Sequence, residues 1–551
     1  MLAPQNRTMF ELLCERAALT PDQSFVLTDS AAFSYAQIEI QARRVASKLA
    51  SGGIGKGSRI GLLATNRIEW LEVFFGASAL GAIIIPISTW STATELAYLF
   101  DDSRLTHLFT LSELADRNFV ADIASVRAGE SSLQLQQVVV FGPEGALPDP
   151  TFQRYEEFQL TRQAKENASP SRGAAARDTL VVLYTSGSSN RPKAVPLVHQ
   201  DLIENGFGIG ERQGLDTTDR VLVAIPLFWS YGAANALPAT LTHGACLVLQ
   251  ERFEAGGALA LIEQHQCTAI YTLPAMTNAL LSHASFEAAR TASLRTGVTI
   301  GTPQDVTTAA TQLGAGSICN IYGSTETYGN CCVTPHDWSL DARATCQGPP
   351  LPGVQIRIRD GELGELCEPG AVGQIEVKGY LTPGYDGDSA RHNAQTFTAD
   401  GYFRTGDLGA LNTAGALVYA GRSTEMIKRS GINVSPAEVE EVLQQHPQVG
   451  QAAVTGVDDA RRGEIIVAYV IAARGLTVCA ATLIDHCRKT LSAYKVPDRL
   501  LFCDTLPLTA TGKLMRRELK AIATVAVNTD SNVESISESK AATKTRINPP
   551  S

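Results

Sequence analysis

Short apolar runs recur between residues 60 and 322, and their spacing is the feature that most constrains the fold. Residues 60–64 and 82–87 are each typical of a buried strand. Between them lies a helical pattern with a candidate N-cap at Asn66 and a stop at Gly81. Its apolar face is formed by Ile68, Leu71, Phe75 and Ala79. The segment therefore predicts a βαβ unit.

The pattern continues in five further apolar runs, most of them separated by enough chain for a helix. They are residues 137–141, 221–227, 245–249, 268–273 and 317–322. Continuous apolar runs are typical of parallel strands that helices cover on both faces. We therefore expect an α/β fold with mostly parallel sheets flanked by helices. A chain of 551 residues is too long for a single core.

A different pattern begins after about residue 420. Ser435 and Glu438 have the spacing of a capping box that opens a helix. Strands are predicted at residues 451–457, 465–471 and 499–502, and a helix at 477–491. This segment predicts a compact α+β unit. From about residue 528 the chain has few apolar residues, and we expect it to be disordered.

Composition excludes several classes of function. The net charge of -10 disfavours a nucleic-acid partner, because phosphate backbones are held by Lys and Arg. No apolar run reaches the ~20 residues needed to span a bilayer, and the N-terminus lacks the pattern of a secretory signal. The 11 cysteines contain no CxxC pair. We expect reduced thiols in a cytoplasmic protein without a membrane span.

Residues 184–195, with sequence YTSGSSNRPKAV, directly follow the apolar run at 180–183. They form a predicted loop that is rich in hydrogen-bond donors. Phosphate oxygens only accept hydrogen bonds, so a loop that holds them needs hydroxyl or N–H donors and a cation. This loop offers Thr185, Ser186, Gly187, Ser188, Ser189 and Lys193. It is not a Walker A loop, because Lys193 is followed by Ala194. A plain Ser/Gly turn with an incidental lysine is the alternative.

Four more motifs follow in order: YGSTE at 322–326, YFRTGD at 402–407, GRSTEMIKRSG at 421–431 and PLTATGK at 507–513. Together with residues 184–195 they resemble the adenylate-forming superfamily of acyl-CoA synthetases, peptide-synthetase adenylation domains and firefly-type luciferases. The chain is most similar to an acyl-CoA synthetase. The resemblance implies a large N-terminal adenylation domain at 1–422 and a small mobile α+β domain at 423–525 that carries the catalytic lysine. Residues 526–551 would form a disordered tail.

The resemblance also implies an activity. A carboxylic acid would react with ATP to give an acyl adenylate and pyrophosphate, and coenzyme A would then take the acyl group and release AMP. The alternatives are an enzyme that loads a stand-alone carrier protein and a non-catalytic sensor of acyl groups or nucleotides. ATP, Mg²⁺ and coenzyme A are the implied cofactors, fatty acid metabolism is the implied context, and we expect a monomer or homodimer.

For the first step, the family pattern assigns the loop from Thr185 to Lys193 to the phosphates, with Thr185 also catalytic. Glu326 would hold Mg²⁺ and take part in catalysis, and Lys513 would be the catalytic lysine that contacts the α-phosphate and the attacking carboxylate. The remaining nucleotide contacts would come from Gly301, Thr302, Pro303, Tyr322, Gly323, Ser324, Thr325, Asp407 and Arg422.

For the second step, relatives rotate the small domain about a hinge, which corresponds to Glu425 here, where most relatives have Asp. The rotation would replace Lys513 by the loop that contains Lys428 and Gly431. Phe228, Trp229 and Tyr231 would line the acid pocket. Trp229 is the candidate gate between this pocket and the thiol route, and ordinary core packing is its alternative.

Overall fold

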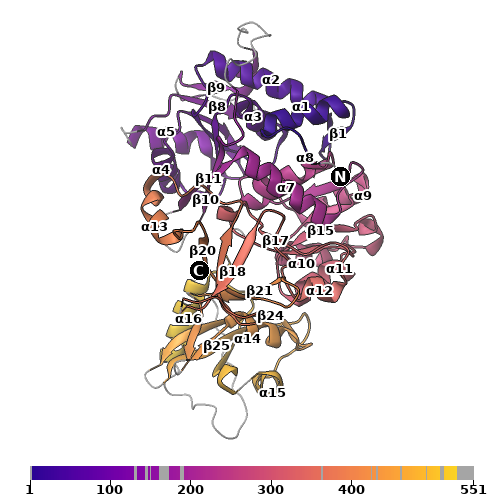
Figure 1. Ribbon diagram of the computed structural model, residues 1–551, viewed down its shortest axis with the longest axis vertical. Coiled ribbons are helices and arrows are strands. Elements are labelled where there is room, and N and C mark those ends of the chain that lie inside the picture. Colours follow the sequence, from indigo (N-terminus) through magenta and orange to yellow (C-terminus); the bar gives the residue numbers. More distant parts are fainter. Residues whose placement is uncertain are drawn as a thin grey trace. The chain divides into compact units, whose positions relative to one another are not determined.

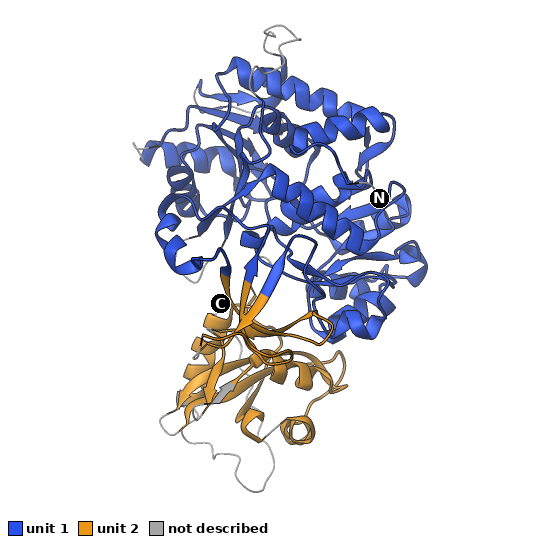
Figure 2. Ribbon diagram, in the orientation of Figure 1, with its two compact units in different colours: residues 1–356, 377–403 blue, residues 357–376, 404–551 orange. Residues whose placement is uncertain are grey.

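The computed structural model describes residues 3–129, 133–142, 147–148, 150–160, 173–185, 192–361, 364–423, 425–429, 432–459, 462–491, 493–508 and 514–529. The chain forms two compact units (Figure 2). Unit 1 holds residues 1–356 and 377–403, and unit 2 holds residues 357–376 and 404–551. The predicted domain boundary after residue 422 stays a prediction.

One large sheet of unit 1 has eight strands within the described residues, in the order β17-β16-β15-β14-β12-β13-β1-β2. The inner neighbours are parallel, whereas β17 and β2 pair antiparallel at the edges. The strands are β1 (Ser24–Leu27), β2 (Ala32–Ser34), β12 (Arg220–Val223), β13 (Cys246–Leu249), β14 (Ala269–Tyr271), β15 (Thr296–Thr299), β16 (Cys319–Tyr322) and β17 (Cys332–Val333).

A second sheet of unit 1 has seven strands within the described residues, in the order β11-β10-β4-β3-β5-β8-β9. All neighbours are parallel except β10 and β11. The strands are β3 (Arg59–Leu63), β4 (Ile83–Pro86), β5 (His107–Leu111), β8 (Gln137–Phe141), β9 (Phe152–Arg154), β10 (Thr179–Thr185) and β11 (Lys193–Val198). The parallel pair β3 and β4, joined by α3 (Ile68–Ala79), is the predicted βαβ unit.

Helices surround these sheets, and the mostly parallel α/β class is confirmed. Helices α1 (Met9–Leu19), α2 (Tyr35–Ser51) and α3 pack side by side (Figure 1). The further helices of unit 1 are α4 (Ala93–Ser103), α5 (Phe119–Gly129), α6 (Tyr155–Leu160), α7 (His199–Gln213), α8 (Leu237–Thr242), α9 (Ala255–His265), α10 (Pro274–Ser282), α11 (Pro303–Thr311), α12 (Leu340–Ala344) and α13 (Asn393–Thr396). The short elements are β6 (Glu113–Leu114), β7 (Arg117–Asn118), η1 (Tyr231–Ala236), η2 (Ala288–Thr291), η3 (Thr325–Thr327) and η4 (Gly387–His392).

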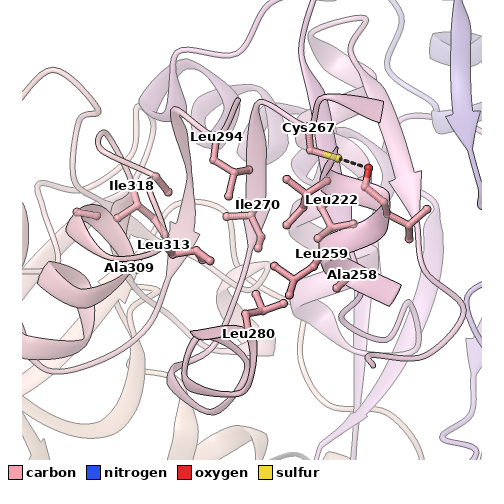
Figure 3. Close-up of a cluster of buried hydrophobic side chains, with 14 of the residues drawn as sticks. Leu222, Ala258, Leu259, Cys267, Ile270, Leu280, Leu294, Ala309, Leu313 and Ile318 are labelled. Carbon is pink, nitrogen blue, oxygen red and sulfur yellow. Dashed lines mark hydrogen bonds between the residues drawn. The ribbon is translucent and has the colours of Figure 1, made fainter. Parts of the chain in front are cut away.

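The core beside the eight-stranded sheet joins its strands to the covering helices (Figure 3). Leu222 of β12 and Ile270 of β14 lie in one buried cluster with Leu259 of α9, Leu280 of α10 and Ala309 of α11. Close packing of this kind resists displacement. It therefore fixes β12 and β14 against the helices that cover them.

Unit 2 contains most of a four-stranded sheet and a second sheet on which helices pack. The first sheet is formed by β18 (Gln355–Arg359), β19 (Gly373–Lys378), β20 (Phe403–Leu411) and β21 (Leu417–Arg422). The second sheet is formed by β22 (Ile427–Arg429), β23 (Ile432–Val434), β24 (Val449–Asp459), β25 (Gly463–Ala472) and β26 (Arg499–Phe502). The helices are α14 (Pro436–Gln444), α15 (Ala480–Thr490), η5 (Ala493–Lys495) and α16 (Arg516–Thr529).

Strand β25 shows how the second sheet of unit 2 acquires helices on both faces. Ile466, Ala468 and Val470 belong to the core with α14 and α15, whereas Val467 and Tyr469 belong to the core with α16. This alternation follows from the two-residue period of a strand. Helix α16 extends into the segment from residue 526 for which we expected disorder. Residues 530–551 lie outside the described residues.

Two local predictions were wrong because tertiary contacts compete for the polar side chains. Helix α3 follows Arg67 without a side-chain cap. Asn66 instead donates to the carbonyl of Ile225 at 2.8 Å and accepts the N–H of Leu227 at 2.7 Å. Ser435 precedes α14 but makes no cap hydrogen bond. Its Oγ donates to the carbonyl of Ala420 at 2.7 Å.

Other global features concern the thiols and the helices. All eleven cysteines are free thiols. Among the described residues, every helix is too short or too polar to cross a lipid bilayer.

Gly76 provides a test of the packing of α3 on α2. A Cβ at this position would lie 2.7 Å from Cγ1 of Val45 and 2.9 Å from the carbonyl oxygen of Ala42. We expect Gly76→Val to lower the stability of the protein by about 1–3 kcal/mol through overpacking, measured as a lower thermal unfolding midpoint. Gly55→Val is the matched control, because a Cβ there meets nothing within 4 Å. Equal midpoints for the two variants would contradict the proposed packing.

Candidate functional site

The two strands that flank the predicted phosphate loop, β10 and β11, form an antiparallel hairpin. Thr185 is the last residue of β10 and pairs across the strands with Lys193, the first residue of β11. Residues 186–191, which include Ser186, Gly187, Ser188 and Ser189, lie outside the described residues. The structure thus places Thr185 and Lys193 opposite each other, where the loop leaves β10 and enters β11.

The base of the hairpin is anchored through Tyr184. Its hydroxyl donates to Oδ2 of Asp102 at 2.6 Å, and Oδ1 of Asp102 accepts the N–H of Asp388 at 2.8 Å. Burial and the neighbouring Asp102 carboxylate raise the pKa of Tyr184, so the hydroxyl keeps its proton. Asp102 therefore ties the loop to the segment around residue 388.

The YGSTE motif forms a tight turn at the carboxyl end of β16. Tyr322 is buried at the strand end, and a Cβ on Gly323 would lie 2.3 Å from the carbonyl oxygen of Gly329. Only glycine fits this close backbone approach. The Ser324 N–H donates to Oγ1 of Thr327 at 2.9 Å, and the short helix η3 places Thr325 and Glu326 directly after the turn.

Tyr385 joins the two motifs, although it lies outside every motif of the sequence. Its hydroxyl donates to Oε1 of Glu326 at 2.8 Å, and Nζ of Lys193 lies 4.8 Å from the centre of its ring. Burial and the Glu326 carboxylate raise the pKa of Tyr385, so it remains a hydrogen-bond donor. The face of the ring attracts the ammonium group. A single side chain thus contacts both the cation and the carboxylate of the candidate site.

The backbone around Tyr385 is held against the same two motifs. The Thr382 N–H donates to the carbonyl of Glu326 at 2.8 Å, and the Asp386 N–H donates to the carbonyl of Ala194 at 3.0 Å. Asp386 also forms an ion pair with Arg59. Burial alone would raise the pKa of Asp386, but the hydrogen bond from Arg59 lowers it. We call residues 382–388 the clamp segment.

The predicted adenine-side turn lies at the end of β15, the parallel neighbour of β16. Gly301 and Thr302 lead into α11, whose first residue is Pro303. Thr302 caps the helix: its Oγ1 accepts the Asp305 N–H at 3.3 Å and donates to Oδ2 of Asp305 at 2.8 Å. Because carboxyl ends of parallel strands meet at one sheet edge, this turn lies beside the Tyr322 turn. Its contact with adenine stays a prediction.

The predicted acid-pocket residues follow β12 at the same sheet edge. Phe228 and Tyr231 are buried, and Trp229 is half-buried. The hydroxyl of Tyr231 donates to the carbonyl of Val298 at 2.8 Å, which fixes the start of a π-helical turn, η1. Such turns are frequent at functional sites. Thr325 donates to Oγ of Ser230 at 3.2 Å, which links this segment to the Glu326 turn.

Unit 2 brings two more predicted residues together. Asp407 of β20 and Arg422 of β21 are cross-strand partners, and Nε of Arg422 lies 3.3 Å from Oδ1 of Asp407. Asp407 is buried, and its N–H donates to Oγ1 of Thr405 at 3.1 Å. The pair therefore places a buried carboxylate beside a guanidinium.

The predicted hinge residue Glu425 also has a partner within unit 2. Its Oε2 lies 2.9 Å from Nε of Arg516, and Arg516 also contacts Glu440 at 2.7 Å. Although burial alone would lower it, the carboxylates of Glu440 and Glu425 raise the pKa of Arg516. Beside them lies a hollow of about 330 Å³, lined in part by Arg517 and Lys520.

The structure describes only part of the loop that is predicted to act in the second step, residues 428–431. The Lys428 N–H in β22 donates to Oε2 of Glu464 at 2.6 Å, and the Lys428 side chain is exposed. Gly431 and Lys513 lie outside the described residues. Arg516, which follows Lys513 closely in the sequence, is the described anchor of that part of the chain.

Comparison with known proteins identifies the family. Residues 13–385 match the model of the AMP-binding enzymes, and residues 438–513 match their C-terminal domain. The indoleacetate–CoA ligase of Aromatoleum aromaticum is 30% identical over 518 residues, which cover 93% of this chain and 97% of the relative. A feruloyl-CoA synthase from an Amycolatopsis species is 30% identical over 511 residues, which cover 92% of this chain and 97% of the relative.

Solved structures agree. The anthranilate–CoA ligase AuaEII in complex with anthranoyl-AMP is 26% identical, with a TM-score of 0.83 over 95% of this chain and 98% of that chain. ATP-bound MatB from Rhodopseudomonas palustris is 25% identical, with a TM-score of 0.81 over 94% and 99%. The chain therefore belongs to the AMP-binding, adenylate-forming enzymes and is an enzyme of their AMP-forming acyl-CoA ligase family.

Proposed function

We propose that this protein is an ATP-dependent ligase that joins a small carboxylic acid to coenzyme A through an acyl adenylate. In the first step a carboxylate oxygen attacks the α-phosphorus of ATP, and the bond to the β-phosphate breaks to release pyrophosphate. In the second step the sulfur of coenzyme A bonds to the acyl carbon, AMP leaves and the thiol gives up its proton. The oligomeric state, the cytoplasmic location and a role in fatty acid metabolism stay predictions.

The contact of Tyr385 with both Lys193 and Glu326 carries this proposal. Adenylation needs a positively charged group beside the leaving phosphates, which are negative, and a carboxylate that binds the same metal cation as these phosphates. Lys193 offers the first and Glu326 the second. Tyr385 is a partner of each group, since its hydroxyl occupies one oxygen of Glu326 and its ring faces Lys193. A direct ion pair, which would neutralise both groups before ATP binds, is thereby disfavoured.

Mg²⁺ fits the donor set around Glu326. This cation is commonly held by one or two carboxylates together with substrate phosphates and water, and it rarely has a cage made of protein alone. Among the described residues, no group of three or more His, Cys, Asp and Glu side chains gathers as a separate metal site. Glu326 would therefore share the cation with the phosphates of ATP. When bound, Mg²⁺ would neutralise charge on these phosphates.

The other residues have complementary roles in this proposal. Thr185 and Thr325 donate hydrogen bonds to phosphate oxygens, and Tyr322 contacts the adenine. The Asp407 carboxylate accepts hydrogen bonds from the ribose hydroxyls, with Arg422 in support. Lys513 bridges the attacking carboxylate and the α-phosphate.

The second step would depend on a rotation at Glu425. The rotation would withdraw Lys513 and bring the loop of Lys428 and Gly431 to the acyl adenylate. Arg516 affects this step because its contact with Glu425 adds an ion pair that is formed or broken as the hinge turns. Trp229 would separate the acid from the route of the thiol.

The direct test of the function is a screen of acids with the purified protein. Short, medium, long-chain and aromatic acids are each supplied with ATP, Mg²⁺ and coenzyme A, and AMP, pyrophosphate and thioester are measured. We expect all three products in equal amounts for at least one acid. Relatives named for indoleacetate, ferulate and anthranilate make aromatic acids the first choice. Acyl transfer to a carrier protein but not to coenzyme A would contradict the proposal.

A substitution of Lys513 should impair the first half-reaction and leave the second intact. We expect Lys513→Ala to lower acid-dependent exchange of pyrophosphate into ATP by at least about 100-fold, because a charge that stabilises the transition state is lost. Thioester formation from supplied acyl adenylate should stay within about twofold of the unmodified enzyme. Lys489→Ala is the matched control, since Lys489 is an exposed lysine on α15 of the same unit. Unchanged exchange in Lys513→Ala would refute its assigned role.

Tyr385→Phe tests the contact with Glu326 while keeping the ring beside Lys193. A hydrogen bond to a charged group contributes about 1.5–3 kcal/mol. We therefore expect kcat/KM for ATP with Mg²⁺ to fall on the order of 10- to 100-fold and the half-saturating Mg²⁺ concentration to rise. Tyr155→Phe is the matched control, because Tyr155 makes the same kind of bond to Oε2 of Glu72 at 2.7 Å elsewhere in unit 1. Equal losses in both variants would indicate a general effect on folding.

A further inference from the structure

Three aromatic side chains from two distant segments of unit 1 form a small cluster. Trp90 lies between β4 and α4, and Phe228 and Trp229 follow β12. The ring centre of Trp90 is 5.3 Å from that of Phe228 and 5.1 Å from that of Trp229, with interplanar angles of 88° and 67°. These are edge-to-face contacts, which are favourable for aromatic pairs. We call the three residues the aromatic cluster.

The aromatic cluster leads from the surface toward the interior. Trp90 is 41% exposed, Trp229 is half-buried and Phe228 is only 7% exposed. A single exposed hydrophobic residue needs no explanation. Trp90 differs because one of its two aromatic neighbours, Trp229, is the candidate gate. The aromatic cluster, which contains the candidate gate, therefore has a buried end at Phe228 and an exposed end at Trp90.

Backbone contacts hold Trp90 in place although its ring is exposed. The Trp90 N–H donates to Oγ of Ser88 at 3.2 Å, and the Ser91 N–H donates to the carbonyl of Ser88 at 3.1 Å. Thr92 then caps α4 through a capping box, and the carbonyl of Thr89 accepts a hydrogen bond from Arg117 at 3.2 Å. A ring on such a rigid turn loses little conformational entropy when a ligand packs on it.

The exposed end of the aromatic cluster, Trp90, indicates which ligand would contact it, and this step rests on the function proposed above. After the first step the acyl adenylate lies at the buried end, and the thiol must reach it from solvent. We propose that Trp90 lines the mouth of the thiol route and packs against the pantetheine arm of coenzyme A. This arm alternates methylene and amide groups. The indole ring offers a broad apolar face to the methylenes and an N–H donor to an amide carbonyl.

The test measures the two half-reactions separately in the full-length enzyme. For Trp90→Ala we expect acid-dependent pyrophosphate exchange and the KM for the acid to stay within about twofold. The KM for coenzyme A should rise on the order of tenfold. Trp90→Phe, which keeps an aromatic face, should recover most of this loss. With a short thiol that lacks the pantetheine arm, Trp90→Ala and the unmodified enzyme should react equally.

Trp338→Ala is the matched control, because Trp338 is a partly buried tryptophan on another loop of unit 1. It should change neither KM. A changed acid selectivity with an unchanged KM for coenzyme A would place Trp90 in the acid pocket and overturn the proposal. An unchanged KM for both substrates would overturn it as well. An unmodified enzyme that forms no thioester with coenzyme A would refute both this proposal and the proposed function.

Discussion

The two contacts of Tyr385 are the interactions on which the candidate site of unit 1 depends. The hydroxyl donates to the Glu326 carboxylate and the face of the ring contacts the Lys193 ammonium, so one side chain is a partner of both charged groups. In a partly buried site, opposite charges at short distance attract by several kcal/mol. An aromatic side chain that contacts each group separately is a physical way to keep both available to a substrate.

Parallel strands explain why groups from distant parts of the sequence can meet Tyr385. The carboxyl ends of β12, β15 and β16 lie at one edge of the eight-stranded sheet, and β4 and β10 end together in the seven-stranded sheet. Ligands of open α/β sheets bind beyond such carboxyl ends. The clamp segment, residues 382–388, then connects β11 to the turn after β16 through backbone hydrogen bonds.

Unit 2 relies on a comparable contact around Arg516. This guanidinium contacts Glu425 at 2.9 Å and Glu440 at 2.7 Å, and it donates to the carbonyl of Val454 at 2.9 Å. Removing one partner would leave a poorly compensated charge, which is costly when the group is partly buried. The start of α16 is therefore linked to the predicted hinge residue by an ion pair.

The sequence by itself determined the positions of several helices and strands. The helix at 68–79 and the strands at 137–141 and 499–502 match α3, β8 and β26, because apolar periodicity reflects burial directly. The order of the motifs also identified the family. Tertiary structure alone decided the uses of Asn66 and Ser435, which bind distant carbonyls in place of capping helices. It also decided the role of Tyr385, because its partners Lys193 and Glu326 are far away in the sequence, and no local pattern encodes a contact that only the sheets create.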